Sequence, residues 1–233
     1  MADTNQYCPG KKFRDPWDKA IVELEQRIRE YPEDISAYIG LAEYYITLWC
    51  FGFLSRKESL PKAKEAAERA MRLDANSSAV HTVLGMLKLS DWDWAGAEQE
   101  FQNAIELDAN DPKPHHWYAL YLSAMGRHKQ ALSESMQAVA IEPSATYKTG
   151  LGSILYFAKD FDRMTEVMEK VVAQDPSFAP GYDWLGMAYV QLGRYEESIQ
   201  VYQKAVALAD GAAEVKAGLG HAYGIAGREA EAR

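Results

Sequence analysis

The stretch Gly181–Leu208, "GYDWLGMAYVQLGRYEESIQVYQKAVAL", decides the fold, because parts of it return at a constant interval. Its Leu185-Gly186 pair is preceded by Leu151-Gly152 and followed by Leu219-Gly220, and each step is 34 residues long. Strand-like alternation is scarce along the chain, and good helix formers fill the spaces between the glycine and proline residues. A period of this length predicts a stack of paired helices.

The same interval indicates which residues let two helices lie close together. Antiparallel helices approach to an axis separation of about 8 Å only where small side chains face each other. In the first helix of successive pairs this small position holds Ala42, Gly85, Ala119, Gly152, Gly186 and Gly220. In the second helix the small residues are Ala63, Ala97, Ala131 and Ser198, followed two turns later by Ala70, Ala104, Ala138 and Ala205. Phe101 and Tyr202 are expected to fill the space beside them.

These features resemble the tetratricopeptide repeat (TPR) over roughly residues 15–233. The resemblance implies an all-α fold, a right-handed α-α superhelix with about five full helix pairs and partial repeats at both ends. The expected divisions are an N-terminal tail (1–14), a lone helix (15–32), repeats at 35–77, 78–111, 112–144, 145–178 and 179–212, and a truncated repeat at 213–233.

The stretch Ser90–Phe101, "SDWDWAGAEQEF", falls at the elbow of one helix pair in this register. Trp94 stands in the turn, Asp93 is expected to cap the second helix, and Trp92 takes the place of a turn glycine. A metal site at Asp91 and Asp93 would need further oxygen ligands and a glycine that are missing, and a propeller blade would need a longer period. The equivalent turn glycines are Gly126, Gly193 and Gly227.

Several departures from the period predict local irregularities. About nine extra residues lie between Leu48 and Ala63, an insert placed at 49–62, and the link from Pro143 to the following first helix is one residue short. Met164 and Val171 stand where alanine is expected, which predicts an altered helix crossing. Two expectations concern the ends: Asp15 and Pro16 begin the lone helix, and the chain stops about two turns into a second helix, as in a fragment of a longer protein.

Composition narrows the classes of function. The formal net charge of −9 disfavours nucleic acid and anionic lipid surfaces as partners. The longest apolar run, Tyr44–Leu54, has 11 residues, well short of the roughly 20 that a membrane-spanning helix needs. Cys8 and Cys50 form neither a metal motif nor a disulfide framework. With no apolar signal segment at the start, we expect a cytoplasmic protein that needs no cofactor.

No catalytic arrangement stands out, so we expect a protein that is not an enzyme. "GLGSIL", Gly150–Leu155, superficially resembles a phosphate-binding loop, but its glycines are small helix positions and no lysine follows. His81 and His115 occupy a large-residue position of the first helix, where packing explains them. His115 and His116 point about 100° apart on a helix, which suits a shared metal poorly.

The stripe of first-helix residues that faces inward is the predicted binding groove for a peptide or protein. Its centre is apolar and adaptable, which suits capture of a peptide or a helix. TPR domains that grip a C-terminal carboxylate use cationic residues on this stripe, and their absence here argues against that mode. The expected groove residues are Ile39, Glu43, Thr82, Met86, Leu89, His116, Leu120, Ser123, Thr149, Ser153, Tyr156, Asp183, Met187 and Val190. We expect about half of them to pack against neighbouring helices instead.

Three further readings stay open. The apolar insert around Trp49–Leu54 either covers the core of the first repeat or offers a contact site. Homo-oligomerisation through an exposed end repeat is an alternative function, and a single-strand RNA reader is a third one that the acidic charge disfavours. Over roughly residues 40–145 the repeats also resemble arrays attached to bacterial regulators, cyclases and kinases, which implies a regulatory interaction module.

Overall fold

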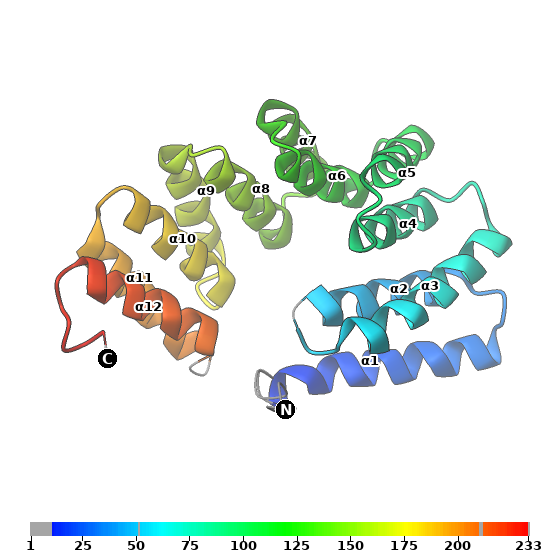
Figure 1. The fold of residues 1–233 in the computed structure, drawn as a ribbon, viewed down its shortest axis with the longest axis horizontal. Helices are drawn as coiled ribbons and strands as arrows, with labels where there is room; N and C mark the ends of the chain where they lie inside the picture. Colours follow the sequence, from blue (N-terminus) through cyan, green and yellow to red (C-terminus); the bar gives the residue numbers. More distant parts are fainter. Residues whose placement is uncertain (1–10, 51, 210–211, 233) are drawn as a thin grey trace. The chain divides into compact units, whose positions relative to one another are not determined.

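Twelve α-helices and no strand make up the residues that the computed structural model describes, 11–50, 52–209 and 212–232 (Figure 1). The chain divides into two compact units, residues 1–117 and 118–233, and the division falls inside one helix. The expectation of an all-α fold is therefore confirmed. Each unit is described by itself below.

The helices alternate between two kinds along the chain. The first helices of the pairs are α2 (Ile35–Cys50), α4 (Ser78–Ser90), α6 (Pro112–Ala124), α8 (Ala145–Phe157), α10 (Ala179–Gln191) and α12 (Ala213–Ile225). The second helices are α1 (Lys11–Glu30), α3 (Arg56–Leu73), α5 (Trp94–Leu107), α7 (His128–Ile141), α9 (Phe161–Gln174) and α11 (Tyr195–Leu208). Unit 1 contains α1–α5 and the start of α6, and unit 2 contains the rest.

The elbow between a first and a second helix has the same backbone in successive pairs. Its middle residue takes a left-handed conformation at Gly126, Gly193 and Gly227, with φ between 72° and 75°. Trp92 has φ 62° at the equivalent place, which confirms that it replaces a turn glycine, and Lys159 does the same with φ 59°. The prediction that Trp94 stands in the turn is wrong by one residue, because the turn ends at Asp93 and α5 begins at Trp94.

Hydrogen bonds at the elbow connect the two helices of a pair. The backbone N–H of Asp93 donates to the carbonyl of Lys88 at 2.9 Å, which closes α4 in the manner of a Schellman motif. The Asp93 side chain then accepts the backbone N–H of Gly96 at 3.0 Å. The expected N-cap of α5 is confirmed, and it satisfies a backbone donor that the helix itself leaves unpaired.

The small position is the eighth residue of each first helix, and in α4, α8 and α10 a large side chain of the following second helix packs against it. A Cβ atom added to Gly85 would lie 2.5 Å from the Phe101 ring, and one added to Gly186 would lie 2.6 Å from the Tyr202 ring. Phe101 is fully buried, which stabilises the fold by about 2–3 kcal/mol relative to an exposed ring. The predicted packing is confirmed for these pairs.

The predicted insert lengthens two helices instead of forming a long loop. Helix α2 has 16 residues where α4 has 13, and α3 has 18 where α5 has 14. The link at 51–55 is two residues longer than the link at 91–93. These differences together account for the nine extra residues. A capping box of Ser55 and Glu58 marks the start of the lengthened α3.

Other departures are partly confirmed. The link 142–144 is one residue shorter than the link 175–178, as expected. Met164 and Val171 are buried in the core of unit 2, while the altered helix crossing stays a prediction. The expected start of the lone helix at Asp15 is wrong, since α1 begins four residues earlier, at Lys11. Past α12 the described residues form turns and no second helix.

Candidate functional site

The first helices of successive pairs contact one another, so their outward side chains form a continuous first-helix surface within each unit. Helix α2 contacts α4 in unit 1, and α10 contacts both α8 and α12 in unit 2. The fourteen expected groove residues all lie on first helices. In both units two of these residues are buried and the others are half-buried, so the kinds of side chain that lie together, and not exposure, define the candidate site.

In unit 1 two of the expected groove residues are buried. Thr82 and Met86 are 0% and 3% exposed, so neither is open to a ligand and their expected role as groove lining is corrected to packing. The Thr82 hydroxyl donates to the carbonyl of Ser78, one turn back, at 2.9 Å. Lys113 Nζ, from α6, donates to both carboxylate oxygens of Glu43 on α2 at 2.8 and 3.0 Å. This ion pair joins two first helices that flank α4.

The remaining groove residues of unit 1, Ile39, Leu89 and His116, are half-buried. Burial lowers the pKa of His116 to about 4, so its imidazole is neutral at physiological pH. A neutral ring can offer a hydrogen bond but no charge. Unit 1 therefore presents scattered side chains in place of a continuous stripe.

In unit 2 two of the expected groove residues are buried as well. Ser123 and Ser153 are buried, and the Ser153 hydroxyl donates to the carbonyl of Gly150 at 2.7 Å, so these two residues also leave the lining. Half-buried side chains remain along α6, α8 and α10. They are Leu120, Thr149, Tyr156, Asp183, Met187 and Val190.

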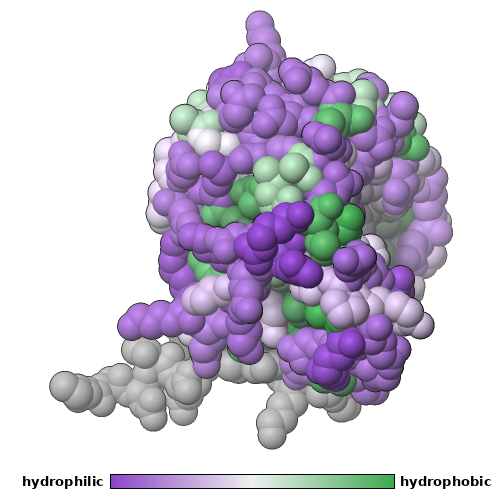
Figure 2. Space-filling view, turned by 90° about the vertical axis from the view of Figure 1, so that its right-hand side faces the viewer, coloured by the Kyte–Doolittle hydropathy of each residue, from purple (hydrophilic) through white to green (hydrophobic). Residues whose placement is uncertain are grey.

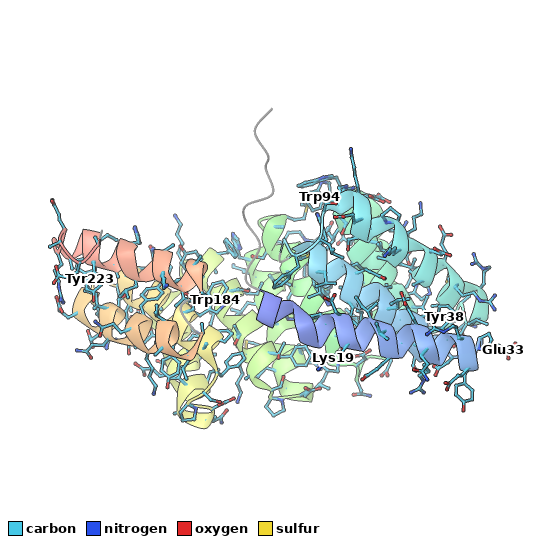
Figure 3. All side chains as sticks on the ribbon, turned by 90° about the horizontal axis from the view of Figure 1, so that it is seen from below. Lys19, Glu33, Tyr38, Trp94, Trp184 and Tyr223 are labelled. Carbon is cyan, nitrogen blue, oxygen red and sulfur yellow. The ribbon has the colours of Figure 1, made fainter. Side chains whose placement is uncertain are left out.

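An aromatic cluster stands at the centre of this stripe. The Tyr156 ring packs edge-on against Trp184 of α10, with a centroid separation of 6.1 Å (Figure 3). Burial raises the pKa of the nearby Tyr202, and the Asp183 carboxylate and the Tyr156 hydroxyl raise it further. Tyr202 is thus neutral and Asp183 supplies a negative charge beside three aromatic rings. Trp184 was not among the expected residues, although it directly follows Asp183.

Helix α12 continues the surface of unit 2 and contains three glycines, Gly218, Gly220 and Gly224. A Cβ atom added to Gly224 would have no neighbour within 4 Å, and one added to Gly220 would meet only the carbonyl oxygen of Ala232, at 3.6 Å. His221 is the exposed polar residue between them. This part of the surface is therefore low and open.

The histidine and aspartate residues that were considered as metal ligands make contacts within the fold instead. His81 lies 2.6 Å from Glu100 through Nδ1 and 3.0 Å from the carbonyl of Ala75 through Nε2, which confirms a packing role. Asp91 pairs with Arg56 at 2.7 Å. Within the described part of the chain, no group of three or more His, Cys, Asp or Glu residues could hold a metal ion. Nor does any described helix have the length and apolar character needed to cross a membrane.

The apolar insert lies against the end of α2. The backbone N–H groups of Phe53 and Leu54 donate to the carbonyl of Leu48 at 2.8 and 3.1 Å, and both side chains are half-buried. Trp49 is half-buried under the guanidinium of Arg56, 5.7 Å from the ring centre. Phe51 lies outside the described residues. The insert is neither bare nor fully covered.

Paired helices stacked at a constant period define the class of all-α helical-repeat proteins. Residues 186–227 match the family model described as TPR repeat. Over these residues the chain is similar to the tetratricopeptide repeat, and the helix pairs before them, from α4 onward, recur at nearly the same 34-residue interval. Members of this family generally act as scaffolds for protein contacts and generally lack catalysis.

Known proteins support the same fold. The transcriptional regulator HilA of Salmonella typhimurium is 25% identical over 142 residues, which is 61% of this chain and 25% of HilA. The match therefore spans about a quarter of that relative. The structure of PilF from Pseudomonas aeruginosa has a TM-score of 0.62, 18% identity, and covers 82% of this chain and 87% of PilF. YrrB, described as a TPR protein with an unusual peptide-binding site, has a TM-score of 0.51, 19% identity, and covers 79% of this chain and 91% of YrrB.

Proposed function

We propose that the chain is a non-catalytic scaffold that binds a peptide or protein on the first-helix surface of unit 2. The observation that carries the proposal is the half-buried stripe from Tyr156 through Asp183 to Met187, which continues onto the glycine-rich α12. In unit 1 Thr82 and Met86 are buried and Glu43 is joined to Lys113 by an ion pair. The others there, Ile39, Leu89 and His116, are half-buried. The packed rings of Tyr156 and Trp184 distinguish the stripe of unit 2 from that of unit 1.

The side chains of this stripe suit a peptide ligand. Met187 is flexible and polarisable, and Tyr156 and Trp184 give large contact areas with few rotatable bonds. Asp183 supplies charge that can fix the register of a bound segment. The glycines of α12 leave backbone accessible to a ligand that lies across it. YrrB, which shares this fold, is itself described as peptide-binding.

We further propose that this scaffold is the interaction module of a bacterial regulatory protein in the cytoplasm. The support is the 25% identity to HilA, a transcriptional regulator of which the match covers 25%. A repeat array in such a protein would receive a partner and pass the signal to an effector domain.

The test is a pull-down from a lysate of the source cells with a groove variant, Leu120→Glu plus Met187→Glu, and with Asp183→Arg. Met136→Glu is the matched control, because Met136 lies on α7, a second helix, and is 48% exposed. We expect both groove variants to lose partners that the control retains. Circular dichroism first establishes that all variants are folded. Retention of one and the same partner set by every variant would falsify the proposal.

A specific observation favours self-association as a second candidate. No large side chain packs against the small position Gly220, whereas the Tyr202 ring packs against the equivalent Gly186. A second copy could place a side chain there. Light scattering over a concentration series tests this: Gly220→Leu should abolish a dimer that the wild type forms. A wild type that stays monomeric at every concentration rules this candidate out.

A further inference from the structure

The back of unit 1 carries a cleft that is separate from the first-helix surface. It lies between two second helices, α1 and α3, and has a volume of about 520 Å³. Ile28, Leu41 and Ala66 give it an apolar floor, and Tyr38 stands beside the C-terminal half of α1 (Figure 3). On the side of the molecule where α1 and α3 end, small apolar patches lie between hydrophilic residues (Figure 2).

The charge of α3 sets this cleft apart. Helix α3 carries six lysine and arginine residues against three glutamates, a net charge of +3. The whole chain has a net charge of −9, so the rest of it carries −12. Helix α5 by contrast has three glutamates and no lysine or arginine. The α1–α3 cleft thus concentrates positive charge on an acidic protein.

The lining of the cleft has four cations and two carboxylates, Glu25 and Glu65. One of the cations, Arg72, lies 4.0 Å from Glu68. No carboxylate of the described residues pairs with Arg29 or Arg69, and the Arg69 guanidinium lies 6.0 Å from the centre of the Tyr38 ring. Lys62 likewise lies over the Tyr45 ring, at 5.1 Å. Aromatic rings hold these cations without neutralising them, so their charge is available to a ligand.

The cleft on the other side of α3 differs in this respect. Its Arg56 pairs with Asp91 at 2.7 Å, and its Lys88 lies 3.5 Å from Asp93. Aspartates of the elbow thus neutralise two cations there, while Lys57 and Lys64 of the same cleft have no ion pair among the described residues. The α1–α3 cleft differs in that two of its unpaired cations lie over aromatic rings.

Helix termini explain only part of this pattern. A cation in the last turn of a helix stabilises the helix dipole, which accounts for Arg29 of α1 and Arg72 of α3. Lys62 lies in the middle of α3 and Arg69 more than a turn's length from Asp74, the cap residue, so neither gains from this effect. Their presence on the wall of one cleft requires another reason.

We propose that the α1–α3 cleft binds an acidic segment of a partner protein. Carboxylates of the segment pair with Arg29 and Arg69, and an apolar side chain lies on Ile28 and Leu41. A polypeptide fits better than a nucleic acid, because the charge of −12 outside α3 repels an extended phosphate backbone and an apolar floor gives phosphates no contact. The site is independent of the first-helix surface proposed above.

The test uses the full chain and a fluorescein-labelled acidic peptide, DEELDEFDELDE, in a fluorescence anisotropy titration. Two control peptides replace its acidic residues with lysine or its apolar residues with alanine. We expect the acidic peptide to bind more tightly at low salt, the alanine peptide to bind more weakly, and the lysine peptide not to bind. Arg29→Ala plus Arg69→Ala should weaken binding about five- to tenfold.

A matched control removes the same charge elsewhere. Lys129→Ala plus Lys170→Ala takes two exposed cations from second helices of unit 2 and should change the affinity less than about twofold. Equal loss in both double variants, or no binding by the wild type, overturns the inference. So does equal loss in Leu120→Glu plus Met187→Glu, because the added carboxylates would repel an acidic peptide that lies on the first-helix surface. Tighter binding of single-stranded oligothymidine with the same dependence on Arg29 and Arg69 would assign the cleft to nucleic acid.

Discussion

One substitution, glycine to alanine at the small position, should have opposite effects in two repeats. In Gly186→Ala the new methyl group would lie 2.6 Å from Cε2 of Tyr202. The ring cannot retreat, because its other edge lies against Gly218, where an added Cβ would be 2.5 Å away. In Gly220→Ala the nearest atom is the carbonyl oxygen of Ala232, at 3.6 Å.

The magnitudes follow from two opposing effects. Alanine in place of glycine inside a helix gains about 1 kcal/mol at either position. At position 186 overpacking costs about 1–3 kcal/mol and offsets this gain, so we expect a net loss of up to about 2 kcal/mol. At position 220 the methyl group meets open space, so we expect a net gain of about 0.5–1 kcal/mol.

Urea unfolding followed by circular dichroism measures the global effect. Hydrogen exchange of amides in α10 and α11 reports the local effect, since repeats can open separately. Gly152→Ala is an intermediate case: its methyl group would meet the flexible end of Met168, at 2.8 Å, which can move aside. If Gly186→Ala proved as stable as Gly220→Ala, the close approach of α10 to the Tyr202 ring would be refuted.

Three further predictions concern the elbow of α4–α5 and one buried histidine. Trp92→Gly should raise the free energy of unfolding by about 0.5–1 kcal/mol, because glycine adopts φ 62° without strain, and a lower melting temperature would contradict this. Asp93→Ala should cost about 1 kcal/mol through loss of the hydrogen bond to Gly96, as measured by urea unfolding, with Asp93→Asn as the control that keeps a cap. The folded-state pKa of His116 is about 4 and its unfolded pKa about 6.5, so the unfolded chain binds the proton first as pH falls. Stability should be full above pH 6.5 and should fall by up to about 1.4 kcal/mol per pH unit towards pH 4, and His116→Gln should remove this part of the slope.

The helix-pair packing could be predicted because it recurs. Gly186 beside Tyr202 and Gly85 beside Phe101 are separate instances of one contact, so the 34-residue interval identifies both without knowledge of either. The left-handed turn at Trp92 was predictable for the same reason, since register alone places it with Gly126. Recurrence thus compensates for weak local signals.

Features that occur once were harder to predict. The insert suggested a loop, whereas its residues extend α2 and α3. Helix α1 begins before Pro16 although proline favours a helix start. In each case the local sequence signal differs from the conformation that the neighbouring helices impose, and the neighbouring helices determine the structure.

The helix face that carries the candidate site could be predicted from the sequence, but the exposure of its side chains could not. Helical spacing places Thr82 and Met86 on the inward stripe, yet it says nothing of how closely the neighbouring helices lie, and both are buried. The ion pair of Glu43 with Lys113 spans 70 residues, beyond the reach of any local pattern. Trp184 was missed although Trp117 occupies the same position of α6, because α8 and α12 have Gly150 and Gly218 there.

The lengthened pair α2–α3 shows that this array tolerates growth only in whole turns. Three extra residues in α2 and four in α3 each add about one turn of 3.6 residues, so buried side chains keep their orientation. A deletion of two residues near the start of α3 would instead rotate the preceding part by about 200° and carry the buried Leu60 out to water. Permitted hairpin lengths in this protein are therefore spaced by the pitch of the helix.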